Sequence, residues 1–255
     1  MRKNDWTGQR LRDLGVAFAL LTRLPLPHVQ EQAFARQAKT VWAFPIVGVV
    51  VALLAAGAGI SALWLGLPAT VAAGVVLVVQ ILVTGAMHED GLADTADGLW
   101  GGWTRERRLE IMKDSAIGTY GVLALVLVVG LRWSALTTLI PLGFGPVVAA
   151  AVLSRAVLPV LMTNLPHARD GGLSHSVGAP RRGPSLASVL LGLVIGTVAV
   201  GSMTWLAALC TAVAAAVVAR LAMSRIGGQT GDILGATQQS AELAVLLSLA
   251  AAMPA

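Results

Sequence analysis

The chain has 255 residues, of which 56% are hydrophobic and only 12% are charged, whereas a soluble domain carries about 25% charged residues. A soluble fold of this length could not bury so much apolar surface, so the composition excludes an ordinary soluble domain. The net charge of +5 does not indicate nucleic-acid binding, because the basic residues are scattered among loops instead of forming one patch.

The N-terminal segment, residues 1–40, precedes the first long apolar run. Leu11, Leu14, Phe18 and Leu21 stand at helical spacing, with arginines around them. This pattern predicts an amphipathic helix that lies in the membrane interface or re-enters the membrane. A helix that packs against the rest of the protein explains the same spacing equally well.

Apolar runs long enough to cross a hydrocarbon core of about 30 Å recur along the rest of the chain. They predict an all-α fold, a polytopic transmembrane helix bundle of about six to seven spans in a single domain over 1–255. The predicted spans lie at about 41–65, 69–87, 119–140, 145–165, 186–203, 204–222 and 241–255.

Three polar loops, at about 88–118, 166–185 and 223–240, separate these spans and alternate with very short turns. If the N-terminus is cytoplasmic, all three loops and nearly all Lys and Arg residues fall on the cytoplasmic side, which is the positive-inside pattern. Two arginines, Arg132 and Arg155, lie within apolar runs, where a charge must snorkel, pair or face a polar cavity. For Arg155 a functional role and a structural ion pair are equally good explanations, and for Arg132 a structural role is favoured.

The first polar loop concentrates negative charge, because seven of the 13 acidic residues fall between positions 89 and 114. On a helix, Asp90, Asp94 and Asp97 stand at i, i+4 and i+7 and therefore share one face. Such carboxylates repel each other unless a hard cation joins them, and oxygen ligands suit Mg²⁺, with Mn²⁺ as a substitute. We expect phosphoryl or nucleotidyl transfer, or ionisation of a diphosphate, with a solvated helix face as the alternative.

A second cluster follows the acidic helix. It contains several basic residues and, after them, Asp114 and Ser115. Arg107, Arg108 and Lys113 could meet phosphate oxygens, although ordinary i,i+4 pairing also explains such charges. The glycines between 118 and 121 would let backbone amides approach an anion.

The third polar loop is rich in glycine and ends in an aspartate. Gly228, Thr230, Gly231 and Asp232 resemble a loop that cradles a phosphate or closes on a metal. The polar loop at 164–174 is expected to contact substrate.

The sequence resembles the cobalamin synthase family, the adenosylcobinamide-GDP ribazoletransferases. The motifs that carry this likeness are HEDGLADTADGL at 88–99, LEIMKDS at 109–115 followed by IGTYG at 117–121, and GQTGDILGA at 228–236. Early elements, TRLP at 22–25 and FPIVG at 44–48, are also similar to the family. Lys113 departs from the family pattern, in which arginine is more usual, and lysine lacks the bidentate fork of arginine.

The resemblance implies a Mg²⁺-dependent, multi-pass enzyme of the bacterial cytoplasmic (inner) membrane. Such enzymes join adenosylcobinamide-GDP to α-ribazole, or to its 5′-phosphate, and release GMP. The residues expected to bind metal are Asp90, Asp94, Asp97, Asp114 and Asp232. Asp94 or Asp97 is expected to accept the proton. The residues expected to contact substrate phosphates are Arg107, Arg108, Lys113, Ser115, Gly228, Thr230 and Gly231. The expected partners are these small molecules and the lipid bilayer, and association into a homo-oligomer is compatible with them.

Two other functions would also use acidic residues in a membrane protein. A CDP-alcohol phosphotransferase also has an aspartate-rich motif, but it would be expected to show an Asp-Gly…Ala-Arg pattern, and no arginine follows Ala93. A cation-coupled transporter would place its aspartates near the bilayer midplane, whereas these aspartates are predicted in a loop at one face.

Overall fold

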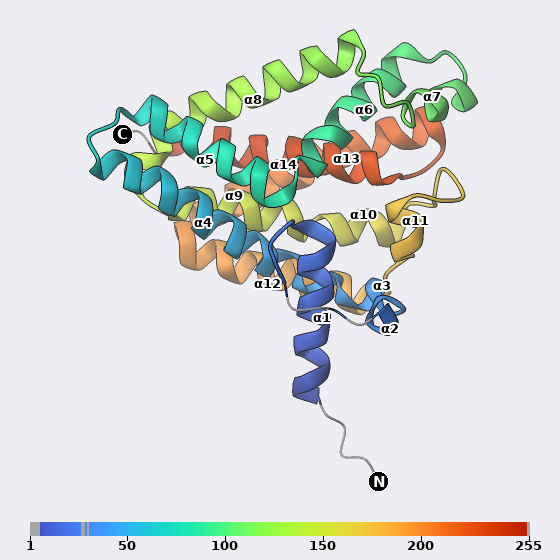
Figure 1. Ribbon diagram of the computed structural model, residues 1–255, viewed down its shortest axis with the longest axis horizontal. Coiled ribbons are helices and arrows are strands. Elements are labelled where there is room, and N and C mark those ends of the chain that lie inside the picture. Colours follow the sequence, from blue (N-terminus) through green and yellow to red (C-terminus); the bar gives the residue numbers. More distant parts are fainter. Residues whose placement is uncertain (1–5, 27–28, 30, 254–255) are drawn as a thin grey trace.

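The computed structural model describes residues 6–26, 29 and 31–253. Its helices form one bundle whose long members run along the longest axis of the molecule (Figure 1). The α-helices, in chain order, are α1 Trp6–Leu21, α2 Glu31–Phe34, α3 Gln37–Thr40, α4 Phe44–Trp64, α5 Ala69–Thr84, α6 Met87–Gly101, α7 Arg105–Ile111, α8 Thr119–Leu139, α9 Gly145–Ala156, α10 Leu158–Asn164, α11 Leu173–Val177, α12 Arg182–Val200, α13 Met203–Ile226 and α14 Gly231–Ala252.

Within the described residues, six helical segments are long and apolar enough to cross a membrane. The pair α5 and α6 passes the same test together, but it is bent by 89° and is therefore a broken span or a re-entrant hairpin. The predicted all-α bundle of six to seven spans is thus confirmed, and the protein is a multi-pass membrane protein. The six segments are Gln37–Trp64, Thr119–Leu142, Gly145–Asn164, Arg182–Val200, Met203–Ile226 and Gly231–Ala252.

The predicted boundaries are wrong at the third loop and the last span. The span begins at Gly231 instead of 241, and α13 continues to Ile226, so the loop predicted at 223–240 shrinks to residues 227–230. Polar residues in the first half of α14 made that half resemble a loop, yet they are buried and paired inside the bundle. The final predicted residues, 254–255, lie outside the described part of the chain.

The N-terminal helix α1 packs one face on the bundle and leaves the other exposed. Val16, Ala17 and Leu21 are buried, whereas Leu11 is 64% exposed. In Figure 1, α1 runs crosswise to the long axis that the spans follow. The buried face confirms the predicted packing against the rest of the protein, while the position of the helix in the membrane interface stays a prediction.

Arg132 of α8 lies inside the bundle, where it binds four acceptors on three other helices. Its two terminal nitrogens donate to Glu89 at 3.3 Å, Gln239 at 2.6 Å, Gln80 at 2.9 Å and Glu242 at 2.8 Å. The side chain is 1% exposed. A guanidinium buried this deeply is stable only when paired, and these bonds tie α5, α6 and α14 to α8.

Arg155 of α9 extends the same polar network. Its Nη1 lies 3.7 Å from Oε2 of Glu242 and donates to the carbonyl of Ala151 at 3.0 Å. Gln238 donates to the same Glu242 oxygen and to Ser154 at 3.2 Å. Both arginines that lie in apolar runs therefore form structural ion pairs. These pairs and their hydrogen bonds link α5, α6, α8, α9 and α14 near the N-terminal end of α6.

Candidate active site

Helix α6 begins after a sharp turn in the backbone. Gly85 and Ala86 both adopt left-handed conformations, with φ of 66° and 57°, which end α5 and redirect the chain into α6. Ala86 is a rare non-glycine residue in this region, so tertiary packing must hold the turn. Glu89 and Asp90 lie in the first turn of α6, where their negative charges interact favourably with the positive end of the helix dipole.

Two glycines let α6 and α14 approach each other closely. A Cβ on Gly91 would lie 2.9 Å from the carbonyl oxygen of Asp232, and a Cβ on Gly235 would lie 3.1 Å from the Cα of Gly91. Neither helix could carry a larger side chain here without moving apart. The contact brings Asp232, at the start of α14, to the acidic face of α6.

The carboxylates of Asp90, Asp94 and Asp232 form the accessible part of this acidic cluster. Asp90 is exposed, and Asp94 and Asp232 are partly exposed. Asp94 lies in electrostatic contact with Asp90, Asp97 and Asp232, and Arg169 supplies the opposing charge. Nη2 of Arg169 donates to Asp232 at 3.0 Å. The structure therefore gathers side chains that are far apart in sequence, from α6, α14 and the loop before α11.

Asp97 has a different environment from the other aspartates of α6. It is buried, and its two carboxylate oxygens accept hydrogen bonds from the backbone N–H of Gly118 at 2.7 Å and of Gly121 at 2.9 Å. These amides lie at the start of α8, where helical N–H groups lack internal partners. The glycine motif does meet an anion, as its sequence suggests, but in this structure that anion is the Asp97 carboxylate.

The cluster offers hard oxygen donors without forming a closed metal cage. No three His, Cys, Asp or Glu side chains in the described part of the chain form a group that could hold a metal by themselves. Mg²⁺ commonly takes only one or two carboxylates and completes its shell with water and substrate phosphates. Asp90 and Asp94, one turn apart on an accessible face, with Asp232 opposite, fit that kind of shared site.

The second predicted cluster lies mostly on the exterior. Arg107 pairs with Glu110 at 3.0 Å, with both side chains exposed, and Lys113 and Ser115 are also exposed. Asp114 is exposed, and its Oδ1 accepts from the N–H of Ala116 at 3.1 Å within its own turn. The contacts of Arg107 and Asp114 therefore lie within their own segment.

Arg108 and the third predicted cluster connect neighbouring loops. Arg108 donates to the carbonyl of Arg225 at 3.1 Å. A Cβ on Gly228 would collide with the carbonyl oxygen of Pro166, and Thr230 caps α14 by accepting from the N–H of Ile233 at 3.2 Å. Gly228 and Thr230 thus have structural roles in this geometry, while Gly231 lines a cavity beside the acidic cluster.

Arg105 is a residue that sequence reasoning missed. Its Nε donates to the carbonyl of Ile226 at 2.9 Å, and its Nη2 donates to the carbonyl of Ala168 at 2.7 Å. One side chain thereby fastens the start of α7 to the other two loops of the site. The acceptors are backbone carbonyls distant in sequence, so no motif in the chain could have revealed the contact.

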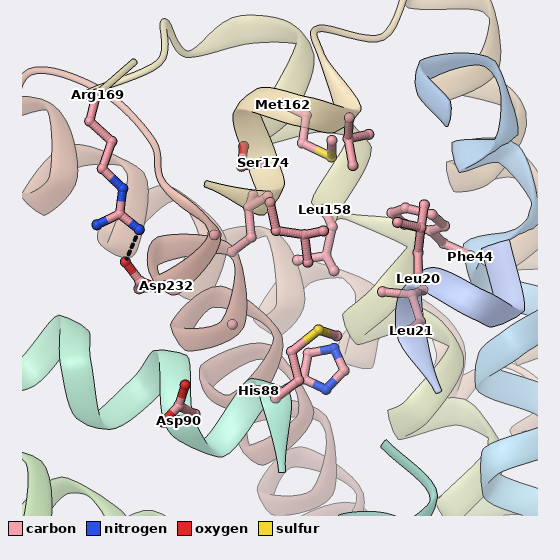
Figure 2. Close-up of a pocket in the computed structure, with 16 residues that line it drawn as sticks. Leu20, Leu21, Phe44, His88, Asp90, Leu158, Met162, Arg169, Ser174 and Asp232 are labelled. Carbon is pink, nitrogen blue, oxygen red and sulfur yellow. Dashed lines mark hydrogen bonds and ion pairs between the residues drawn. The ribbon is translucent and has the colours of Figure 1, made fainter. Parts of the chain in front are cut away.

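A cavity of about 230 Å³ opens beside the acidic cluster, between α1, α4, α6, α10, α11 and α14. Figure 2 shows Leu20 and Phe44 on one side and Asp90 and the Arg169–Asp232 pair on the other, with His88 between them. The cavity therefore has an apolar side and a charged side. The loop at 164–174, from which substrate contact is expected, supplies Arg169 and part of the wall.

Comparison with known proteins gives a consistent result over nearly the whole chain. Residues 13–250 match a family model described as cobalamin-5-phosphate synthase. A protein of Bradyrhizobium diazoefficiens named adenosylcobinamide-GDP ribazoletransferase is 45% identical over 94% of each chain. Proteins with the same name from a Sinorhizobium species and from Azorhizobium caulinodans are 41% and 42% identical, over 96% and 94% of this chain and 98% and 95% of their own. No solved structure matches.

Proposed function

The chain belongs to the cobalamin-5-phosphate synthase family, and we propose that its acidic cluster carries the transfer reaction for which its relatives are named. The protein is an adenosylcobinamide-GDP ribazoletransferase in the final step of cobalamin synthesis. It joins adenosylcobinamide-GDP to α-ribazole, or to the 5′-phosphate of α-ribazole, and releases GMP. The observation that carries the assignment of the site is that Asp90 and Asp232 line a two-sided cavity and that both act electrostatically on the partly exposed Asp94.

We further propose that Asp90, Asp94 and Asp232 hold Mg²⁺, for which Mn²⁺ can substitute, together with the diphosphate of the substrate. The ion would neutralise the diphosphate and the charge that develops on the departing GMP. The support for this is the donor set, because accessible carboxylate oxygens one turn apart suit a hard cation that shares its shell with phosphates.

Asp94 is the better candidate of the two predicted proton acceptors. Both oxygens of Asp97 already accept backbone hydrogen bonds at the start of α8, whereas Asp94 is partly exposed on the cluster. In the proposed reaction a ribose hydroxyl other than the 5′-hydroxyl, which carries the phosphate in α-ribazole 5′-phosphate, forms a bond to phosphorus while the bond to GMP breaks, and Asp94 accepts the hydroxyl proton. Arg169, beside Asp232, places positive charge near the diphosphate.

The proposed location is the bacterial inner membrane, with the active-site loops facing the cytoplasm. Its support is the positive charge in those loops and at the helix ends beside them, where Arg105, Arg169, Arg181 and Arg225 lie.

Transfer by the purified full-length protein in lipid nanodiscs tests the proposed activity. We expect adenosylcobinamide-GDP and α-ribazole to yield adenosylcobalamin and GMP in equal amounts. Chromatographic measurement of both products checks this. Failure to form adenosylcobalamin, or GMP release that does not depend on α-ribazole, would contradict the proposal.

Removal of divalent metal tests the proposed role of the cluster. Treatment with a chelator should abolish transfer, and added Mg²⁺ or Mn²⁺ should restore it, because the charged diphosphate lacks a neutralising ion without metal. Calorimetric titration of Mg²⁺ in the presence of GDP provides a readout that does not depend on turnover. Full activity in metal-free buffer would argue against the metal assignment.

A further inference from the structure

We infer that the cavity beside the acidic cluster binds the aromatic base of the nucleoside substrate and that His88 recognises a ring nitrogen of that base. The inference rests on the proposed function, because it assigns one of the two substrates of that reaction to this cavity. The corrinoid substrate then meets the acidic cluster from outside the cavity.

Size decides which substrate enters. The cavity measures about 230 Å³, below the roughly 300–1,000 Å³ of pockets that enclose drug-sized ligands. A corrin macrocycle is larger than such ligands and cannot fit, whereas one bicyclic aromatic base can. α-Ribazole is a ribonucleoside of dimethylbenzimidazole, whose base is flat, bicyclic and methylated.

The apolar side of the cavity matches the surface of such a base. Leu20 and Leu21 at the end of α1, Phe44 of α4 and Leu158 of α10 line it. Burial of methyl and ring carbons against these side chains is favourable at roughly 25 cal/mol for each Å² removed from water. Figure 2 shows Leu20, Leu21 and Phe44 on the side away from the Arg169–Asp232 pair.

The charged side of the cavity sets the orientation of the nucleoside. Asp90, Asp232 and Arg169 line it, and Asp90 and Asp232 both act electrostatically on Asp94. Ribose hydroxyls can form hydrogen bonds to these charged groups. The described residues on the apolar side offer no such partners, so that side suits the base and not the sugar. A base bound against α1 and α4 thus directs its sugar, and the attacking ribose hydroxyl, toward the acidic cluster.

His88 supplies the polar contact to the base. It lines the cavity and is 3% exposed, and its Nε2 has no hydrogen-bond partner among the described residues. A buried polar atom without a partner is costly and calls for an explanation. The unsubstituted ring nitrogen of the base is an acceptor, so Nε2–H of His88 can donate to it.

Binding of α-ribazole alone to the full-length protein in nanodiscs tests the cavity. Leu20→Trp adds bulk on the apolar side and should weaken binding at least tenfold. Leu11→Trp adds the same bulk on the exposed face of the same helix and should leave binding unchanged. In turnover, Leu20→Trp should raise the KM for α-ribazole and leave the KM for adenosylcobinamide-GDP unchanged.

An analogue in which CH replaces the unsubstituted ring nitrogen tests His88 separately. The wild type should bind this analogue about tenfold more weakly than α-ribazole, which corresponds to about 1.4 kcal/mol. His88→Phe should bind both ligands equally, a result that general loss of structure does not produce. Equal binding of both ligands by the wild type, or discrimination that survives in His88→Phe, would overturn the role of His88.

The outcomes for the cavity and for the proposed function are distinguishable. If the wild type makes no adenosylcobalamin, the proposed function fails. If the wild type turns over but Leu20→Trp raises only the KM for adenosylcobinamide-GDP, the assignment of the cavity to the base is overturned while the proposed function stands.

Discussion

At the scale of single residues, the three aspartates of α6 share a register but not a role. Asp90 and Asp94 face the accessible cluster, whereas Asp97 is buried against two backbone amides of α8. Helical spacing predicts that the three lie on one face of a helix, but it cannot show which element that face meets. The partner amides of Asp97 are 21 and 24 residues away.

Conservative substitutions separate these roles by their effects on stability. Asp97→Asn should lower the free energy of unfolding by about 1–3 kcal/mol, because the amide removes the charge and turns an NH₂ group toward a backbone donor. Asp94→Asn should not lower it in metal-free buffer, because it relieves repulsion with Asp90, Asp97 and Asp232. Thermal unfolding of both variants in detergent compares them, and a larger loss in Asp94→Asn would contradict these assignments.

At the scale of secondary structure, close contacts between helices shape the site. The contact between α6 and α8 requires glycine at 121, where a Cβ would collide with Oδ2 of Asp97 and lie 3.1 Å from the carbonyl oxygen of Ala93. The contact between α6 and α14 requires Gly91 and Gly235 in the same way. The acidic cluster is therefore built by helix packing, not by the loops that the sequence suggested.

Two alanine substitutions on α8 test this requirement. Gly121→Ala should lower the midpoint of thermal unfolding and reduce transfer activity, because α8 must move away from Asp97. Gly130→Ala lies on the same helix, and a Cβ there meets nothing within 4 Å. That variant should resemble the wild type in both measurements. Equal behaviour of the two variants would show that the contact between α6 and α8 does not position the site.

At the scale of the whole molecule, the buried network of Arg132, Arg155 and Glu242 joins the spans beneath the acidic cluster. Glu242 is 1% exposed and accepts from Arg132 at 2.8 Å and from Gln80 at 3.0 Å. Without this carboxylate, two buried guanidinium groups would lose their shared counter-ion. Removing one partner from a buried ion pair typically costs about 3–5 kcal/mol.

Glu242→Leu should therefore sharply reduce the yield of folded protein and the midpoint of thermal unfolding. Leu247→Ala, on an exposed part of the same helix, is the matched control and should change both quantities little. Size-exclusion profiles and thermal unfolding of the purified proteins measure these effects. Wild-type stability in Glu242→Leu would contradict the structural role of the network.

The sequence predicts much of this architecture because long apolar runs report directly on the membrane environment. The start of α14 could not be predicted in this way, because Gln238, Gln239 and Glu242 lower its apolar character and only their tertiary partners make them compatible with burial. The aspartate motif indicated the site, whereas the cavity, His88 and the links made by Arg105 depend on segments that meet only in the folded chain.

The central claim is that the accessible carboxylates at the rim of the bundle carry the transfer chemistry. GMP release by Asp94→Asn, inserted in membranes and folded as the wild type, measures this most directly, with Glu106→Gln as a control on the exposed surface of α7. We expect Asp94→Asn to lose about 100-fold or more in turnover, the scale seen when one preorganised electrostatic group is removed, and Glu106→Gln to lose little. Normal turnover in folded Asp94→Asn would contradict the account.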